Sequence, residues 1–285
     1  MKVSYSRVNT FKQCPYQYYL RYIKGLQTKF NLDPKNALVL GTAVHTGIEK
    51  RDVLEAIKSY YSNYPSVTPL MINEAIKLEI LVDKAIRELP EGEYELLIED
   101  DDFKGFIDML VKVDEKQKIW VNSGNVNPIT GEVMGYYKEV SQPFETYDLY
   151  DFKYSNNIDN YLKSGQLHVY KYWFEKLTGH KIRNMYFVFI PKVNLKQEED
   201  EDVELYRERL IADCEKQEIR IEQVNYDYNK VIEFLLDTKK CIECKDFNKN
   251  PSKLCYWCDY RKYCNSDGKE DGNIIYPEET KKEEK

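Results

Sequence analysis

An almost continuously apolar segment at 184–191 restricts the fold more than any other feature of the sequence. Its residues, NMYFVFIP, are typical of a β-strand that is buried on both faces. Such a strand needs a covering layer on each side of its sheet, and amphipathic segments before and after it can supply that layer. The spacing of apolar residues and the capping signals predict helices over about 4–23, 42–61, 70–89, 158–178, 201–216 and 227–243.

Extended segments fill the middle of the chain. Residues 94–99 and 103–113 are joined by an acidic turn, and residues 135–141 and 147–153 follow a hairpin turn at 127–131. The chain therefore runs through helices, strands, one helix, one strand and further helices. This order predicts an α/β fold in which a mixed sheet is flanked by helices, with helical additions at both ends.

A carboxylate and a lysine lie two residues apart in the strand expected at 147–153. Asp151 and Lys153 leave the same face of that strand, because side chains alternate along it. Asp108, in the run Gly105-Phe106-Ile107-Asp108, adds a carboxylate on a neighbouring strand. Two converging aspartates can bind Mg²⁺ or Mn²⁺ for work on phosphate esters. An Asp-x-Lys pair alone is more often a solvated surface pair, so other residues of the motif are needed to support a metal site.

The composition restricts the location and the partners. The 285 residues are 42% hydrophobic and 32% charged, and the net charge is −7. No segment approaches the roughly 18 apolar residues of a membrane helix, and the N-terminus lacks the apolar core of a secretory signal, so we expect a cytoplasmic protein. A basic field over the whole surface is absent, which counts mildly against nucleic acid but leaves room for a locally basic groove.

Two predicted helices carry further polar residues that support a functional role for the Asp-x-Lys pair. His45 follows Gly41 near the start of one helix, and Gln166 and Tyr170 lie on one face of another. With these residues the chain resembles the RecB-like branch of the PD-(D/E)XK nucleases, which includes CRISPR-associated RecB-like exonucleases and the AddB nuclease domain. That branch has a helix-borne His, a Gly-x-x-Asp strand, an Asp/Glu-x-Lys strand and a Gln-x-x-x-Tyr helix. The matching residues, in the same order, are His45, Gly105 and Asp108, Asp151 and Lys153, and Gln166 and Tyr170.

The resemblance implies a fold, an activity and a metal site. The fold would be restriction-endonuclease-like, and the activity that of a deoxyribonuclease, most simply an exonuclease of recombination, repair or replication. Its setting would be a bacterial cell or a phage-infected host. His45, Asp108, Asp151 and the backbone carbonyl of Phe152 would bind Mg²⁺ or Mn²⁺.

The resemblance also implies roles around the metal. Lys153 would orient or activate the attacking water, and Asp108, Asp151 and Lys153 would form the catalytic set. Gln166 and Tyr170 would support the site or touch the DNA backbone. The chain departs from the family in two ways. The link between the two aspartates is longer than usual, and an Asp precedes the lysine where many relatives have Glu.

Three cysteines are clustered far along the chain. Cys255, Cys258 and Cys264 have the spacing C-x2-C-x5-C, which in a cytosolic protein indicates metal or cluster ligation rather than disulfides. A cluster or metal with four ligands would need a fourth ligand in addition to these three thiolates. Iron–sulfur members of the RecB-like group carry it in a Cys-Pro motif near the N-terminus, as Cys14-Pro15 does here. The resemblance therefore implies a 4Fe–4S cluster on these four cysteines.

A zinc ribbon is the alternative use of the cysteines. Cys241 and Cys244 combine with Cys255 and Cys258 into C-x2-C-x10-C-x2-C, a spacing that can hold Zn²⁺. This arrangement leaves two of the cluster cysteines without a role, so we favour the cluster. Cys214 lies in a helical segment and is expected to be buried.

We expect a single nuclease domain over 1–264. Within it, residues 1–25 and 241–264 would together form the iron–sulfur subdomain, and 115–146 would be a hairpin insertion. The remaining segment, 265–285, is rich in Lys, Glu and Asp and is expected to be a disordered tail.

Other functions stay open from the sequence. A non-catalytic DNA-binding or complex-forming module could keep the same fold, and a zinc-ribbon interaction protein could carry the Asp-x-Lys pair by accident. DNA, as single strands or duplex ends, is the expected partner, and no membrane partner is expected. The sequence has no GxxxxGK[ST] loop, so a helicase or recombination partner would have to supply any motor. An oligomer is compatible with the family.

Overall fold

A five-stranded mixed sheet forms the centre of the protein. The computed structural model describes residues 2–113, 116–141 and 143–277. Across the sheet the order of strands is β2 (Glu93–Glu99), β3 (Lys104–Val113), β6 (Thr146–Tyr154), β7 (Lys181–Ile190) and β8 (Arg220–Val224). β6 and β7 are parallel and the other neighbours are antiparallel. The α/β fold class predicted from the sequence is confirmed, and the sheet is consistent with a restriction-endonuclease-like core.

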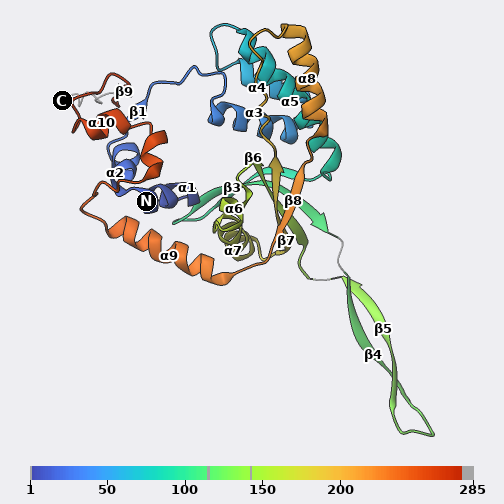
Figure 1. Ribbon diagram of the computed structural model, residues 1–285. Coiled ribbons are helices and arrows are strands. Elements are labelled where there is room, and N and C mark those ends of the chain that lie inside the picture. The colour runs from blue at the N-terminus through green and yellow to red at the C-terminus, as the bar shows by residue number, and fades with distance from the viewer. Residues whose placement is uncertain (1, 114–115, 142, 278–285) are drawn as a thin grey trace, which may run out of the picture.

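Helices cover both faces of this sheet (Figure 1). The helices on one face are α3 (Ala37–Lys50), α4 (Val53–Tyr61), α5 (Pro69–Glu88) and α8 (Val203–Lys216), and those on the other are α6 (Ile158–Leu162), α7 (Gln166–Thr178) and α9 (Tyr228–Glu243). Phe152 belongs to the first core and Leu149 to the second, as the alternation along β6 requires. Asp151 and Lys153 therefore face the layer of α6 and α7.

The helix predicted over 42–61 is two helices. The side chain of Asn36 accepts a hydrogen bond from the Leu38 N–H, so α3 begins before the predicted start. Arg51 then adopts a left-handed backbone with φ of 48°, and the Asp52 side chain caps α4. Apolar periodicity does not show this break, because both helices direct their apolar faces at the same core.

The first predicted helix is also divided. α1 (Tyr5–Gln13) ends at Cys14, and the chain continues through α2 (Pro15–Tyr18) and a π-helical turn, η1 (Tyr19–Ile23). Pro15 cannot donate a backbone hydrogen bond, so it begins a new helix more readily than it continues an old one. Gly25, with φ of 66°, follows this segment, whose end agrees with the end of the helix predicted over about 4–23.

The segments near the two ends of the chain lie side by side at one edge of the protein (Figure 1). β1 (Gln27–Thr28) pairs with β9 (Ile274–Ile275), and η2 (Lys253–Trp257) and α10 (Arg261–Asn265) lie close by. The sequence predicts a disordered tail from residue 265, whereas the structure gives 265–277 this strand and a buried Ile274. Composition misses the pairing because two adjacent isoleucines are outnumbered by polar neighbours. Residues 278–285 lie outside the described part of the chain.

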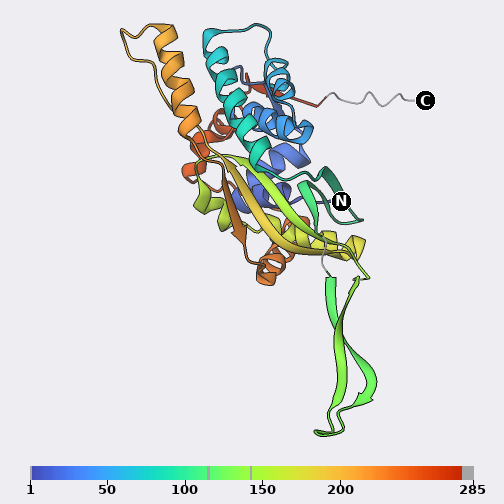
Figure 2. The same ribbon diagram turned by 90° about the vertical axis from the view of Figure 1, so that its right-hand side faces the viewer.

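A long hairpin arm, residues 116–141, extends away from the rest of the protein (Figures 1 and 2). Its strands, β4 (Lys116–Val126) and β5 (Val133–Ser141), form a sheet of their own. The arm has the position of the hairpin insertion predicted at 115–146, although residues 115 and 142 lie outside the described part. None of the described helices has the length and apolar character needed to cross a bilayer.

Candidate active site

The ladder between β3 and β6 ends at the candidate active site. Met109 pairs with Tyr150, and the pairing does not continue to the next opposed positions, Asp108 and Asp151. The two strands fork there. The Phe152 N–H donates a hydrogen bond of 2.7 Å to Asp108 Oδ2, so this buried backbone donor is satisfied by a carboxylate. The fork thereby brings the two predicted aspartates to one opening in the sheet.

His45 reaches this fork from α3. Its Nε2 lies 3.0 Å from the carbonyl oxygen of Phe152, and its Nδ1 lies 3.6 Å from Asp108 Oδ2. A neutral ring that donates from Nε2 to the carbonyl leaves the Nδ1 lone pair directed toward the carboxylate. Val44 and Ile48, fully buried on the same helix, fix the position of the ring. The sequence-predicted histidine and aspartate are therefore neighbours.

Glu95 on β2 belongs to the site, and the sequence reasoning missed it. Its Oε1 lies 4.0 Å from His45 Nδ1. In the described part of the chain, His45, Glu95 and Asp108 are the one group of three or more such side chains whose ligand atoms all lie within 4.8 Å of one another. The register sets Glu95 opposite Asp108, and Glu95 has a left-handed backbone with φ of 50°. Such a conformation costs about 1–3 kcal/mol in a non-glycine residue and is common at functional sites.

Asp151 and Lys153 form an ion pair on the face of β6 that looks toward α6. The Asp151 side chain is 1% exposed and the Lys153 side chain 15% exposed. Apart from this ion pair, neither carboxylate oxygen of Asp151 has a hydrogen-bond partner among the described residues. Buried carboxylates are normally hydrogen-bonded, so the free lone pairs of Asp151 are suited to a metal ion.

The pKa values show that negative charge is concentrated in the fork. Burial and the neighbouring charge of Asp151 raise the pKa of Asp108 to about 7. Burial opposes protonation of Lys153 and of His45, but the nearby carboxylates outweigh it and raise both pKa values. Protons on these groups are thus stabilised by the neighbouring carboxylates, and a divalent cation could replace them.

Gln166 and Tyr170 lie behind the fork on α7. Gln166 Nε2 donates a 3.3 Å hydrogen bond to the hydroxyl of Tyr170. The Tyr170 ring packs against Phe103 and against Gly105, where an added Cβ would come within 3.0 Å of both rings. Gly105 of the Gly-x-x-Asp strand and Tyr170 of the Gln-x-x-x-Tyr helix therefore pack directly against each other. Burial and the charge of Asp151 raise the pKa of Tyr170, so its hydroxyl stays protonated.

Comparison with known proteins agrees with this geometry. Residues 2–122 match the family model of the PD-(D/E)XK nuclease superfamily. This supports the superfamily. The matched segment contains His45, Glu95 and Asp108, covers less than half of the chain, and ends before Asp151 and Lys153. No curated protein matches the chain.

Glu95→Gln is expected to weaken Mn²⁺ binding by at least roughly tenfold, because it removes one negative charge from the group of candidate metal ligands. The measurement is a titration of Mn²⁺ followed by thermal unfolding, since a ligand that binds the folded state raises its stability. Glu99→Gln on the same strand is the matched control, because Glu99 pairs with Lys2 at 2.7 Å instead. Equal Mn²⁺ affinity in the two variants would remove Glu95 from the metal site.

Gly105→Ala is expected to destabilise the protein by about 1–3 kcal/mol, because the new methyl group would displace the Tyr170 or Phe103 ring. Gly41→Ala is the matched control. A Cβ at Gly41, within α3, would meet no atom within 4 Å, so this change should stabilise by about 0.5–1 kcal/mol through helix propensity. Chemical denaturation measures both variants. Equal effects would show that the Gly105 contact is not tight.

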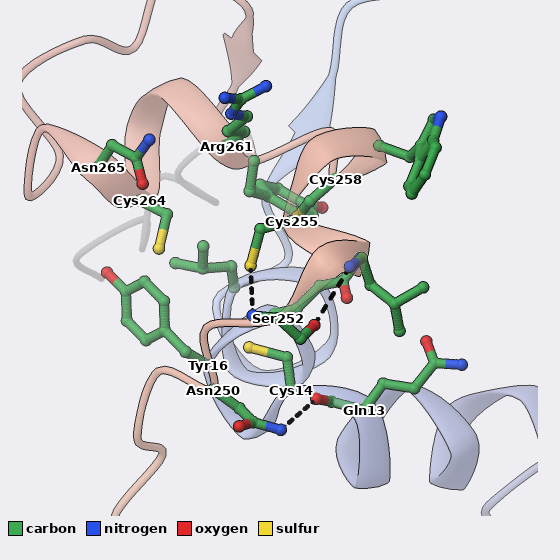
Figure 3. A pocket seen from close by; sticks show the side chains of 15 residues that line it. Gln13, Cys14, Tyr16, Asn250, Ser252, Cys255, Cys258, Arg261, Cys264 and Asn265 are labelled. Atoms are coloured by element: carbon green, nitrogen blue, oxygen red, sulfur yellow. Dashed lines mark hydrogen bonds between the residues drawn. The ribbon is translucent and has the colours of Figure 1, made fainter.

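A second candidate site lies where the two ends of the chain meet (Figure 3). The four cysteines predicted as cluster ligands all line one hollow of about 230 Å³: Cys14, Cys255, Cys258 and Cys264. Figure 3 shows the sulfur atoms of Cys14, Cys255 and Cys264 directed into this hollow. The Cys255 sulfur also accepts a hydrogen bond from the Ser252 N–H. Residues about 240 positions apart in the sequence therefore share one small space.

The remaining cysteines are elsewhere. Cys241 is buried near the end of α9, and neither it nor Cys244 lines the hollow. Cys214 is buried on α8, as expected. The structure thus groups the four cysteines of the predicted cluster and does not group the four of the zinc alternative.

Proposed function

We propose that the protein is a metal-dependent deoxyribonuclease that hydrolyses phosphodiester bonds, acting as an exonuclease on DNA ends or single strands. One observation carries this proposal: three strands and a helix deliver a histidine, three carboxylates and a lysine to one fork in the sheet. The match to a nuclease superfamily supports the same reading. Recombination, repair or replication would be its setting, with a helicase or recombination partner.

The residues at the fork suit Mg²⁺ or Mn²⁺. His45 Nδ1 and the carboxylates of Glu95, Asp108 and Asp151 would hold the ion, because hard cations of this kind prefer oxygen donors. The bound metal would lower the pKa of a water and offset charge on the phosphate. Phe152 was predicted to add its carbonyl as a ligand. Here that carbonyl accepts from His45 Nε2, an arrangement that orients a ligating imidazole.

Lys153 supplies the positive charge of the proposed mechanism. It is held by Asp151, and the rings of Tyr161 and Phe187 lie 5.5 and 5.8 Å from its ammonium group. Aromatic rings at this distance attract the ammonium group and limit its contact with solvent, which strengthens its electrostatic effect at short range. From this position the ammonium group would orient the attacking water and stabilise negative charge that develops on the phosphate oxygens. Gln166 and Tyr170 would support the fork from behind.

We also propose a 4Fe–4S cluster on Cys14, Cys255, Cys258 and Cys264. All four of these cysteines line one hollow, which supports the proposal. Cys241 and Cys244, which a zinc ribbon would need, do not line it. Hydrolysis needs no electrons, and the cluster would act as a structural clip between the two ends of the chain.

Cleavage of end-labelled DNA tests the proposal. Single strands and duplexes are incubated with Mn²⁺, with Mg²⁺ or with EDTA. Metal-dependent products that shorten stepwise from one labelled end would support an exonuclease and report its polarity. A folded, metal-loaded sample that cleaves no DNA would contradict the proposal in favour of a non-catalytic binding module.

A further inference from the structure

The sheet face that carries Lys153 continues onto β8. Lys153 pairs with Phe189 on β7, and Phe189 pairs with Arg220 on β8. Residues directly paired across strands share a face, so these three side chains form one row. Adjacent strands are about 4.8 Å apart, which puts the Arg220 backbone about 10 Å from that of Lys153. The neighbouring row consists of Asp151, Phe187 and Glu222. The same face therefore changes from acidic to basic along the strands.

A second hollow, of about 320 Å³, opens at the Arg220 end of this row. It lies between the loop after β6, the end of β7 and the turn from α8 into β8. Ser155, Phe189, Lys216 and Arg220 are among the residues that line it. Phe189 also contacts the Tyr161 ring at 5.9 Å, and that ring covers the Lys153 ammonium group. The hollow is thus joined to the proposed catalytic lysine through two aromatic rings.

Two exposed cations of this hollow are not neutralised. Within the described residues, neither Lys216 nor Arg220 forms an ion pair, whereas the arginine on the same helix as Lys216, Arg209, is held by Glu201 at 2.7 Å. Glu218 is the one carboxylate among the described lining residues, so the lining has a net charge of +1. The chain as a whole has a net charge of −7. An anion is therefore the ligand that this hollow fits.

We propose that this hollow binds a backbone phosphate of the substrate strand next to the cleavage site, with Arg220 and Lys216 as its ligands. This inference rests on the proposed nuclease function. An arginine can bind a phosphate through two parallel hydrogen bonds, and a lysine adds a point charge. A separation of about 10 Å corresponds to at most roughly three nucleotides at a rise of 3.4 Å each. The hollow would hold the strand while the fork acts on the scissile phosphate.

Arg220→Gln is the test variant, Lys216→Gln is a second variant, and Arg87→Gln is the matched control. Arg87 is an exposed arginine on α5 that pairs with Asp83. Substrates are oligonucleotides with one neutral methylphosphonate at successive linkages around the mapped cleavage site. We expect Arg220→Gln to raise KM roughly three- to tenfold with kcat within about twofold. The slope of log binding constant against log salt concentration should fall by about 0.7 to 0.9.

The decisive outcome is the position-specific one. The wild type should lose affinity when one particular phosphate, apart from the scissile one, is neutralised, and Arg220→Gln should be insensitive to the same change. If the wild type cleaves DNA but Arg220→Gln, Lys216→Gln and Arg87→Gln respond alike at every linkage, the phosphate site is wrong and the nuclease stands. If the wild type neither cleaves nor binds DNA, the proposed function and this inference both fail.

Discussion

Lys153→Ala should reduce metal-dependent DNA cleavage by at least roughly 100-fold, a loss typical of removing one group that stabilises charge in a transition state. Lys153 is the cation that pairs with Asp151 at the fork, and it is only 15% exposed. Water cannot easily replace a charge in such a place. The measurement is the initial rate on end-labelled DNA with Mn²⁺. The matched control is Lys239→Ala, because Lys239 is an exposed lysine on α9 that pairs with Glu243.

The same variant has a second signature in stability. Removing the lysine leaves the buried carboxylate of Asp151 without its ion-pair partner, which should cost on the order of 3 kcal/mol in the metal-free protein. Added Mn²⁺ should recover part of this loss, because in the proposed site it would bind the same carboxylates. Thermal unfolding with and without Mn²⁺ separates this result from general misfolding. Cleavage that survives Lys153→Ala at the wild-type rate would place the active site elsewhere.

Cys14→Ser should remove bound iron and loosen the subdomain that joins the two ends of the chain. A clip from Cys14 to Cys255 closes a loop of about 240 residues. A cross-link that closes a loop of this length lowers the entropy of the unfolded chain and should stabilise the protein by on the order of 5 kcal/mol. We therefore expect lower iron and sulfide content, a lower unfolding temperature, and easier proteolysis near residues 250–265. Metal analysis and limited proteolysis of anaerobically purified protein measure these effects.

The other cysteines provide controls for this result. Cys244→Ser should leave the iron content unchanged, because Cys244 does not line the hollow. Cys258→Ser should behave like Cys14→Ser, because both residues line it. If the wild-type protein contained zinc and no iron, and if Cys244→Ser lost this zinc, the cluster proposal would be wrong and the zinc ribbon would be supported.

Much of the site follows from short-range patterns in the sequence. Alternation along a strand is enough to place Asp151 and Lys153 on one face, and helical spacing is enough to pair Gln166 with Tyr170. What the sequence cannot supply is the register between strands. Glu95 lies in a run with Glu93 and Glu99, and any of the three could be a solvated edge residue. Only the pairing of β2 with β3 and the left-handed backbone distinguish it.

For the fold as well, the sequence predicts the long regular elements and misses features that depend on single residues or on distant partners. Long periodic segments such as α5 and buried runs such as β7 are evident because many residues agree on one pattern. Breaks within helices are set by single residues, such as the left-handed Arg51, which periodicity averages away. Short strands such as β8 and β9 depend on partners distant in the chain. These short strands form because of tertiary pairing, and local propensity alone does not predict them.

The meeting of the chain ends has a consequence for the order of events on the ribosome. Hydrogen bonds of the terminal subdomain join Tyr260 to Leu26 and Asn250 to Gln13, across separations of 234 and 237 residues. At synthesis rates of roughly 5–20 residues per second, the later partners emerge some 12–50 seconds after the earlier ones. The fork residues, all between 45 and 153, are made well before that. In a nascent chain the proposed catalytic residues would thus be present for several seconds before the two ends of the chain could pair.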